Sequence, residues 1–186
     1  MREWIRKARY RANEEGAAAI EFALVVPVAM LAIVGILEIS LIMFADYKME
    51  QAVSEISRQI RTGQASAAGM TQQQFKQYVC SHMLVLNNNC VNDLKVDVQE
   101  FPDFASVKFP PAVKEEQSSG GSTSLTLSSS VGTLFNIGSA ESIIGVRVYY
   151  QWPYMTPFIA NALNKISVDG KALLSAAGAF RNEPFN

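Results

Sequence analysis

Glu21 and Glu38 are the only ionisable residues in an apolar run that extends from Ala17 to Ala45. A carboxylate in lipid is costly to maintain, so it marks a functional site unless it can reach the headgroups. Glu21 lies near the start of the run, and its position alone leaves both interpretations open. Glu38 lies roughly 100° away around a helix, and we expect it near the opposite headgroups.

Cys80 and Cys90 are the only cysteines in the sequence. If this part of the chain lies in an oxidising compartment, a disulfide is the expected state. The short loop that it closes would stabilise the fold by about 2.8 kcal/mol in the chain-entropy model. A metal site is the weaker alternative, because His82 is the only histidine and no second cysteine pair accompanies the first.

Motifs for catalysis are missing from the sequence. We find no phosphate-binding glycine loop, zinc motif or Gly-x-Ser-x-Gly elbow, and a single histidine limits the possible catalytic triads. The net charge of −1 gives no signal for a polyanionic ligand. The sequence therefore predicts a protein that is not an enzyme, uses no cofactor or metal, and does not bind nucleic acid.

The apolar run from 17 to 45 is long enough to cross a bilayer, which takes about 20 residues. It is about twice as long as the apolar stretch of a secretory signal peptide, and uniformly apolar helices of this length are rare in soluble domains. Basic residues are concentrated before the run, at Arg2, Arg6, Lys7, Arg9 and Arg11. The positive-inside rule then predicts a cytoplasmic N-terminus, with everything after residue 45 across the membrane.

The helix is expected to continue beyond the membrane, over residues 46–62. Apolar residues recur there at spacings of four, three and four, which is typical of an amphipathic helix. Gly63 follows as a natural C-cap. The apolar stripe needs cover from the rest of the chain, and consists of Met49, Val53, Ile56 and Ile60.

Residues 63–186 are predicted to form an α+β domain. Thr71 and Gln74 make a capping box for a second helix, whose apolar face runs through Phe75, Val79, Met83 and Leu86. His82 is expected to be structural, and "NNN" at 87–89 to form a turn. Period-two patterns then predict strands over 94–99, 104–109 and "IIGVRVYYQW", with a short helical turn at 159–163.

Two further features of this domain concern its turns. The Ser/Gly-rich stretch 114–132 is either a mobile loop or a hairpin in which "SLTLS" is a strand. "ISVDGKALLSAAGAF" is expected to be two strands joined at Asp169–Gly170, a type I′ hairpin dipeptide. The predicted fold is therefore a small antiparallel sheet packed on the long helix.

A cluster of aromatic residues surrounds the end of one predicted strand. Two interpretations are open, a position in the core and sheet surface or a contact surface for a partner protein. The candidate partner contacts are Tyr150, Trp152, Tyr154 and Phe158, with Tyr149 beside them.

The segment Gly16-Ala17-Ala18-Ala19-Ile20-Glu21-Phe22 resembles the processing site of type IV prepilins. The resemblance implies that residues 1–16 are a basic leader, which a membrane prepilin peptidase removes by cutting between Gly16 and Ala17. The new ammonium of Ala17 would then lie about one helical turn from Glu21. In pilins this glutamate is thought to pair with the N-terminal amine of a neighbouring subunit, so a carboxylate in lipid gains a partner during assembly.

The chain as a whole resembles the TadE-like pseudopilins of the tight-adherence (Tad/Flp) pilus system. "GAAAIEFALVVPVAMLAIVGILEIS" carries the strongest likeness, with weaker likeness at "LNNNC", "VDVQEF", "WPY" and "FRNEPF". This resemblance implies a minor pilin in the bacterial inner membrane with a periplasmic C-terminal domain. Its expected partners are the prepilin peptidase, other pilins or pseudopilins, the inner-membrane Tad assembly machinery and the bilayer.

Two other interpretations share some of these features. A type II secretion pseudopilin would also have Gly16 and Glu21, but its periplasmic pattern would differ. An uncleaved single-pass inner-membrane protein could carry a periplasmic binding or sensor domain, in which case Gly16 would be incidental.

Overall fold

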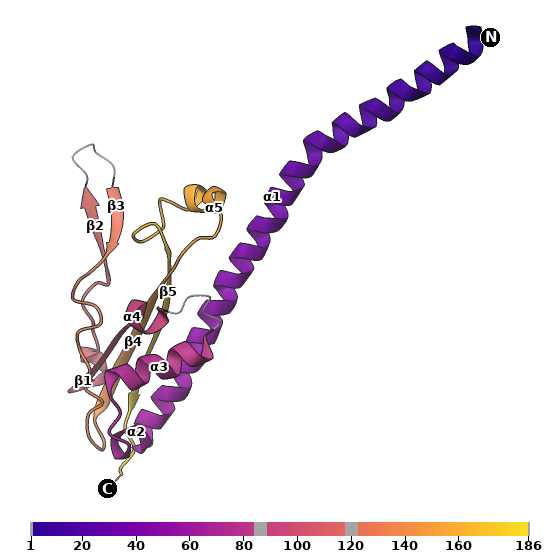
Figure 1. The fold of residues 1–186 in the computed structure, drawn as a ribbon. Helices are drawn as coiled ribbons and strands as arrows, with labels where there is room; N and C mark the ends of the chain where they lie inside the picture. Colours follow the sequence, from indigo (N-terminus) through magenta and orange to yellow (C-terminus); the bar gives the residue numbers. More distant parts are fainter. Residues whose placement is uncertain (1, 84–88, 118–122, 186) are drawn as a thin grey trace. The chain divides into compact units, whose positions relative to one another are not determined.

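The structure, a computed structural model, describes residues 2–83, 89–117 and 123–185, with side chains from residue 16 onward. A long helix, α1 (Arg2–Arg61), is followed by short helices and two antiparallel sheets (Figure 1). The chain divides into two compact units, Met1–Ile39 and Ser40–Asn186. The predicted α+β class with a long apolar N-terminal helix is confirmed.

Helix α1 begins at Arg2, earlier than the predicted start near residue 17. The basic leader is rich in Arg, Glu and Ala, which favour helix, and it has no Gly or Pro before Gly16. At the other end, Gly63 follows the helix with a φ of 77°, as its predicted role as a C-cap requires. A Cβ at this position would also lie 2.5 Å from Cγ of Phe185, so packing favours glycine there as well.

Three short helices follow, α2 (Gln64–Ala67), α3 (Gln72–His82) and α4 (Cys90–Asp93). The predicted capping box of α3 is present, because the side chains of Thr71 and Gln74 each accept the other's backbone N–H. The expected apolar face of α3 is buried at Phe75 and Val79, and Met83 just after it is 7% exposed. Leu86 and the first two residues of the predicted Asn turn lie outside the described residues.

The larger sheet has three antiparallel strands in the order β1-β4-β5. They are β1 (Lys95–Phe101), β4 (Ile143–Trp152) and β5 (Ala172–Arg181). Strand β4 lies in the centre and pairs with a neighbouring strand along both of its edges. It is rich in β-branched and aromatic residues, which favour strands. The predicted strand "IIGVRVYYQW" is therefore confirmed, and helix α5 (Pro157–Ala162) confirms the helical turn after it.

Strands β2 (Val113–Gln117) and β3 (Thr123–Leu127) form a separate antiparallel hairpin. Of the two structures considered for the Ser/Gly-rich stretch, the hairpin is the one observed, and "SLTLS" supplies most of its second strand. The connecting residues 118–122 lie outside the described part of the chain.

The prediction of a strand over 104–109 is wrong. Residues Phe104–Ser106 form a 3₁₀ turn, η1, and no strand follows it before Pro110. Asp103 Oδ1 accepts a hydrogen bond from Ser106 N at 2.7 Å, and Ser106 Oγ donates to Asp103 O at 2.8 Å. These local bonds satisfy the backbone without a strand partner.

The prediction of two strands around Asp169–Gly170 is half right. Both residues have positive φ, 53° and 71°, as a tight type I′ turn requires. Only the second strand, β5, is present, because Val168 makes isolated bridges instead of a strand. Asp169 N donates to Leu125 O at 2.9 Å, so this segment is held by β3.

The core of the second unit lies between the sheet and the C-terminal part of α1. All four residues of the predicted amphipathic stripe are buried, at 0–4% exposure, and join one cluster with the apolar residues of β1, β4 and α3. Packing of the helix extension on the sheet is thus as predicted.

A buried ion pair joins β1 to β4, and nothing in the alternating pattern predicted it. Asp97 Oδ2 accepts from Arg147 Nε at 2.9 Å, and the two side chains are 0% and 3% exposed. Asp97 Oδ1 also accepts three backbone N–H bonds, from Gly132, Thr133 and Leu134. Although Asp97 stands at a polar position of the alternating pattern, it is buried and anchors the segment that follows the hairpin.

Candidate functional site

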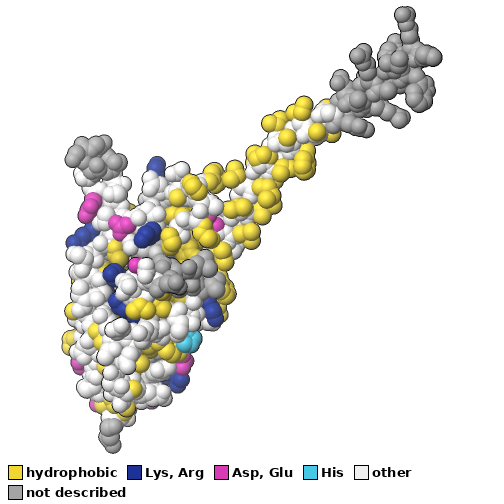
Figure 2. Space-filling view, in the orientation of Figure 1, with side chains coloured by type: hydrophobic (Ala, Val, Ile, Leu, Met, Phe, Trp, Pro, Cys, Tyr) yellow, Lys and Arg dark blue, Asp and Glu magenta, His cyan; other side chains and the backbone are white. Residues whose placement is uncertain are grey.

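The apolar part of α1 exposes large side chains along its length. Between Ile20 and Phe44 many Leu, Ile, Val, Met and Phe side chains are exposed, with Phe22 at 69% and Leu24 at 71%. Figure 2 shows this helix covered by hydrophobic side chains. By length and composition, it is long and apolar enough to cross a membrane.

The residues of the expected processing site, Gly16, Ala17 and Glu21, are all exposed on this helix. A Cβ at Gly16 would meet nothing within 4 Å, so no packing contact requires glycine there. Ala17 and Glu21 are four residues apart and lie on the same helix face, about 6 Å apart along the axis. The helix therefore leaves both groups exposed on one face, where the groups of a neighbouring subunit could reach them.

Glu38 has a different environment from Glu21. Its side chain is only 2% exposed, whereas Glu21 is exposed. We expected Glu38 to reach toward the headgroups, which would leave its side chain exposed, but the side chain is buried.

The predicted disulfide is present between Cys80 in α3 and Cys90 in α4, with Cα atoms 5.9 Å apart. His82, next to it, has its Nδ1 2.8 Å from Tyr78 O, and its ring stacks on Tyr78. These contacts give the histidine a structural role. Among the described residues, no group of three His, Cys, Asp or Glu side chains is placed to hold a metal ion.

The four aromatic residues considered as partner contacts separate into two pairs. Tyr150 and Trp152 are 1% and 3% exposed and belong to the core, and burial raises the pKa of the Tyr150 phenol. Their burial leaves no surface for a partner, so the alternative core interpretation applies to them. Tyr154 is half-buried, and Phe158 on α5 is 57% exposed.

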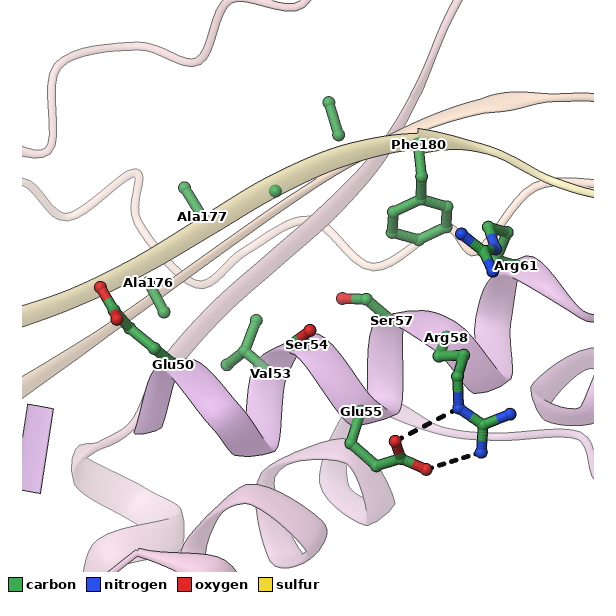
Figure 3. A pocket seen from close by; sticks show the side chains of 12 residues that line it. Glu50, Val53, Ser54, Glu55, Ser57, Arg58, Arg61, Ala176, Ala177 and Phe180 are labelled. Carbon is green, nitrogen blue, oxygen red and sulfur yellow. Dashed lines mark hydrogen bonds and ion pairs between the residues drawn. The ribbon is translucent and has the colours of Figure 1, made fainter. Parts of the chain in front are cut away.

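A groove of about 510 Å³ lies between α1 and the edge strand β5 (Figure 3). It is open at Gly178, where a Cβ would meet nothing within 4 Å. Ser57 is 9% exposed, and its Oγ has no hydrogen-bond partner among the described residues. Local sequence patterns give no signal for this groove, because its two walls are more than a hundred residues apart in the chain.

Two of the charged residues that line the groove, Glu55 and Arg58, form an ion pair. Arg58 Nη2 lies 2.7 Å from Glu55 Oε1, and this hydrogen bond lowers the pKa of the Glu55 carboxyl. Glu55 therefore stays ionised at neutral pH and is a poor proton acceptor. The small side chains and the Glu55–Arg58 ion pair suit contact with another polypeptide better than proton transfer.

Comparison with known proteins identifies one family. Residues 16–58 match the family model described as TadE-like protein. No curated protein and no solved structure matches the chain. The match begins at Gly16 and covers Glu21, the exposed apolar helix and most of its amphipathic extension. The predicted likeness to TadE-like proteins is thus confirmed over residues 16–58.

Proposed function

We propose that this chain is a pseudopilin, or minor pilin, needed for assembly of a Tad pilus. The observation that carries the proposal is the TadE-like match, which begins at the expected cleavage residue and continues along an exposed apolar helix. Family members of this pilin-related kind are typically structural proteins, which fits a role without catalysis.

The first step is removal of residues 1–16 by a prepilin peptidase. Hydrolysis of the peptide bond between Gly16 and Ala17 consumes one water and leaves a carboxylate on Gly16 and an ammonium on Ala17. Gly16 supports this assignment, because glycine inside a helix costs about 1 kcal/mol relative to alanine. The bond to be cut therefore lies where the helix opens at least cost.

The second step is pairing of Glu21 with the Ala17 ammonium of a neighbouring pilin or pseudopilin. In lipid an unpaired carboxylate is disfavoured, so the pair forms where two subunits meet and sets their register. The exposed apolar side chains around Glu21 supply the packing surface for neighbouring helices in the bilayer.

The charge distribution sets the orientation that we propose. The basic leader keeps the N-terminus in the cytoplasm, and residues 46–62 and the domain from 63 onward are periplasmic. An oxidising periplasm is consistent with the disulfide between Cys80 and Cys90. There the domain contacts other pseudopilins or the inner-membrane Tad machinery.

The intact mass of the membrane-extracted protein tests the processing step. We expect residues 1–16 to be lost only in cells that contain the prepilin peptidase, and Gly16→Ala to block the loss. A full-length mass with the peptidase present would contradict the proposal and favour an uncleaved membrane protein with a binding or sensor domain.

Substitution of Glu21 tests the assembly step. Glu21→Ala should abolish or strongly reduce piliation, while cleavage and membrane insertion continue. The matched control is Glu14→Ala, which removes a carboxylate from the leader that the peptidase discards. Normal piliation of the Glu21→Ala variant would refute the pairing mechanism.

A further inference from the structure

Exposed apolar side chains gather on the segment between β4 and β5. Outside α1, the described residues with large exposed apolar side chains are few, and three of them belong to this segment: Met155 at 50%, Phe158 at 57% and Ile166 at 70%. A soluble surface rarely concentrates such side chains, so the cluster marks an interaction site.

This segment lies at the end of the sheet where α1 enters the second unit. Trp152 pairs with Ala172, so the chain leaves and re-enters the sheet at the same end. Close to that end, Ser175 N donates to Asp46 Oδ1 at 3.2 Å. Figure 1 shows α5 at this end of β4 and β5.

Asp46 also marks where the apolar run of α1 stops. Met43 and Phe44, just before it, are 67% and 47% exposed, and Tyr47 after it is 55% exposed. Aromatic residues at this transition are typical of a membrane–water interface. Within the second unit, the exposed end of the apolar helix and the exposed segment around α5 therefore lie at the same end of the sheet.

The segment itself carries few charged side chains. From residue 153 to residue 168 the sequence has no Asp or Glu, and Lys165 is its only charged side chain. Lys165 is exposed and adjacent to Ile166. Glu115 and Asp169 line the same depression as Lys165, so charge does not select anionic headgroups here. The exposed apolar side chains, at the end of the sheet where the apolar run of α1 stops, favour a lipid interface.

We propose that the segment from Pro153 to Ile166 inserts its apolar side chains into the bilayer interface on the domain's side of the membrane. It would form a second membrane contact beside α1, hold the domain against the bilayer and fix which face other subunits can reach. This inference rests on the proposed membrane crossing by α1.

Depth-dependent quenching tests the inference with the full chain in vesicles of phosphatidylcholine and phosphatidylglycerol. Single cysteines at Phe158 and at Ile166 would carry an environment-sensitive fluorophore, since both native cysteines are in the disulfide. The matched control is Phe104→Cys, because Phe104 is 55% exposed and follows β1 at the opposite end of the sheet. All three side chains are exposed, so the substitutions should leave the fold intact.

Spin-labelled lipid should quench the fluorophores at 158 and 166 by at least about half, and the one at 104 hardly at all. Equal quenching at 158 and 104 would overturn the inference. A blue-shifted but unquenched fluorophore at 158 would also overturn it, because a protein would then cover the segment. A fluorophore at Leu31→Cys separates the two proposals: if it is quenched while 158 is not, only the second contact fails. If it is not quenched, the membrane crossing fails and the second contact fails with it.

Discussion

The two parts of helix α1 are built from similar apolar residues but have opposite surroundings. In the part before Ala45, large apolar side chains such as Leu24 and Ile36 are 71% and 66% exposed. In the part after it, Met49 and Ile56 are both 0% exposed. One continuous helix thus contains a stretch whose apolar side chains are exposed and a stretch whose apolar side chains pack on the sheet.

The difference follows from how the apolar residues are spaced. Before Ala45 they occupy nearly every position, so no single protein surface could cover them all. After Ala45 they are confined to one stripe among Glu, Gln, Ser and Arg, and one sheet is enough to bury it. We therefore expect substitutions to destabilise the domain only where its side chains are buried.

The largest effect is expected from the buried ion pair of the domain. Asp97→Ala should destabilise the domain by about 3–5 kcal/mol, because it leaves Arg147 buried without its counter-charge. The exposed pair gives the matched control, since Glu55→Ala should cost far less stability because solvent screens this pair. Thermal unfolding of the full chain in detergent, followed by near-UV circular dichroism, measures both. An equal loss of stability in the two variants would show that burial does not determine how much an ion pair contributes to stability.

Truncation of isoleucine compares the two parts of α1 directly. Ile56→Ala should destabilise the domain by about 2–5 kcal/mol, because it leaves a cavity under the sheet. Ile33→Ala, at a position 52% exposed, should leave the unfolding temperature of the domain nearly unchanged. A comparable shift for Ile33→Ala would mean that the domain also depends on the exposed part of the helix.

Removal of the disulfide should have an intermediate effect. The double variant Cys80→Ser, Cys90→Ser should lose about 2.8 kcal/mol of stability, from the loop entropy released in the unfolded state. A reducing agent should lower the unfolding temperature of the wild type to that of the variant and leave the variant unchanged. Free labelling of either cysteine in the unreduced wild type would argue against the bond.

The smallest effect is expected from acid. The hydrogen bond from Arg58 lowers the pKa of Glu55 below its ordinary value of 4.5. The folded state thus binds this proton less readily than the unfolded state, so the contribution to stability is present above pH 4.5 and is lost as pH falls below it. Glu55→Gln should flatten this acidic decline slightly in thermal unfolding at a series of pH values. Glu50→Gln, an exposed neighbour on the same helix, is the control, and the same flattening in both would exclude a specific role for the pair.

Much of the architecture could be predicted from local sequence signals. Gly63 ends α1 because the backbone there has positive φ, and the Thr71–Gln74 box starts α3 with bonds between residues three positions apart. The spacing of Gly16 and Glu21 is likewise a local signal, and it agrees with the start of the family match.

Errors arose where local and distant bonds compete. Residues 104–109 alternate like a strand, but the side chain of Asp103 closes a 3₁₀ turn first. Val168 precedes a sound type I′ turn, yet the backbone there bonds to Leu125, far away in the sequence. A period-two pattern does not show whether a neighbouring strand is present to pair with the segment. It therefore predicted strands at both places where none forms.

The sequence by itself determined the long apolar helix, its amphipathic continuation, the main strands and the TadE-like motif, because each depends on residues within a few turns of one another. Only the tertiary structure decided that Asp97 pairs with Arg147 inside the core, that Tyr150 and Trp152 are buried, and that exposed apolar residues gather around α5. These features depend on which segments distant in sequence meet in space, and the free energy of such contacts is not encoded in any local spacing.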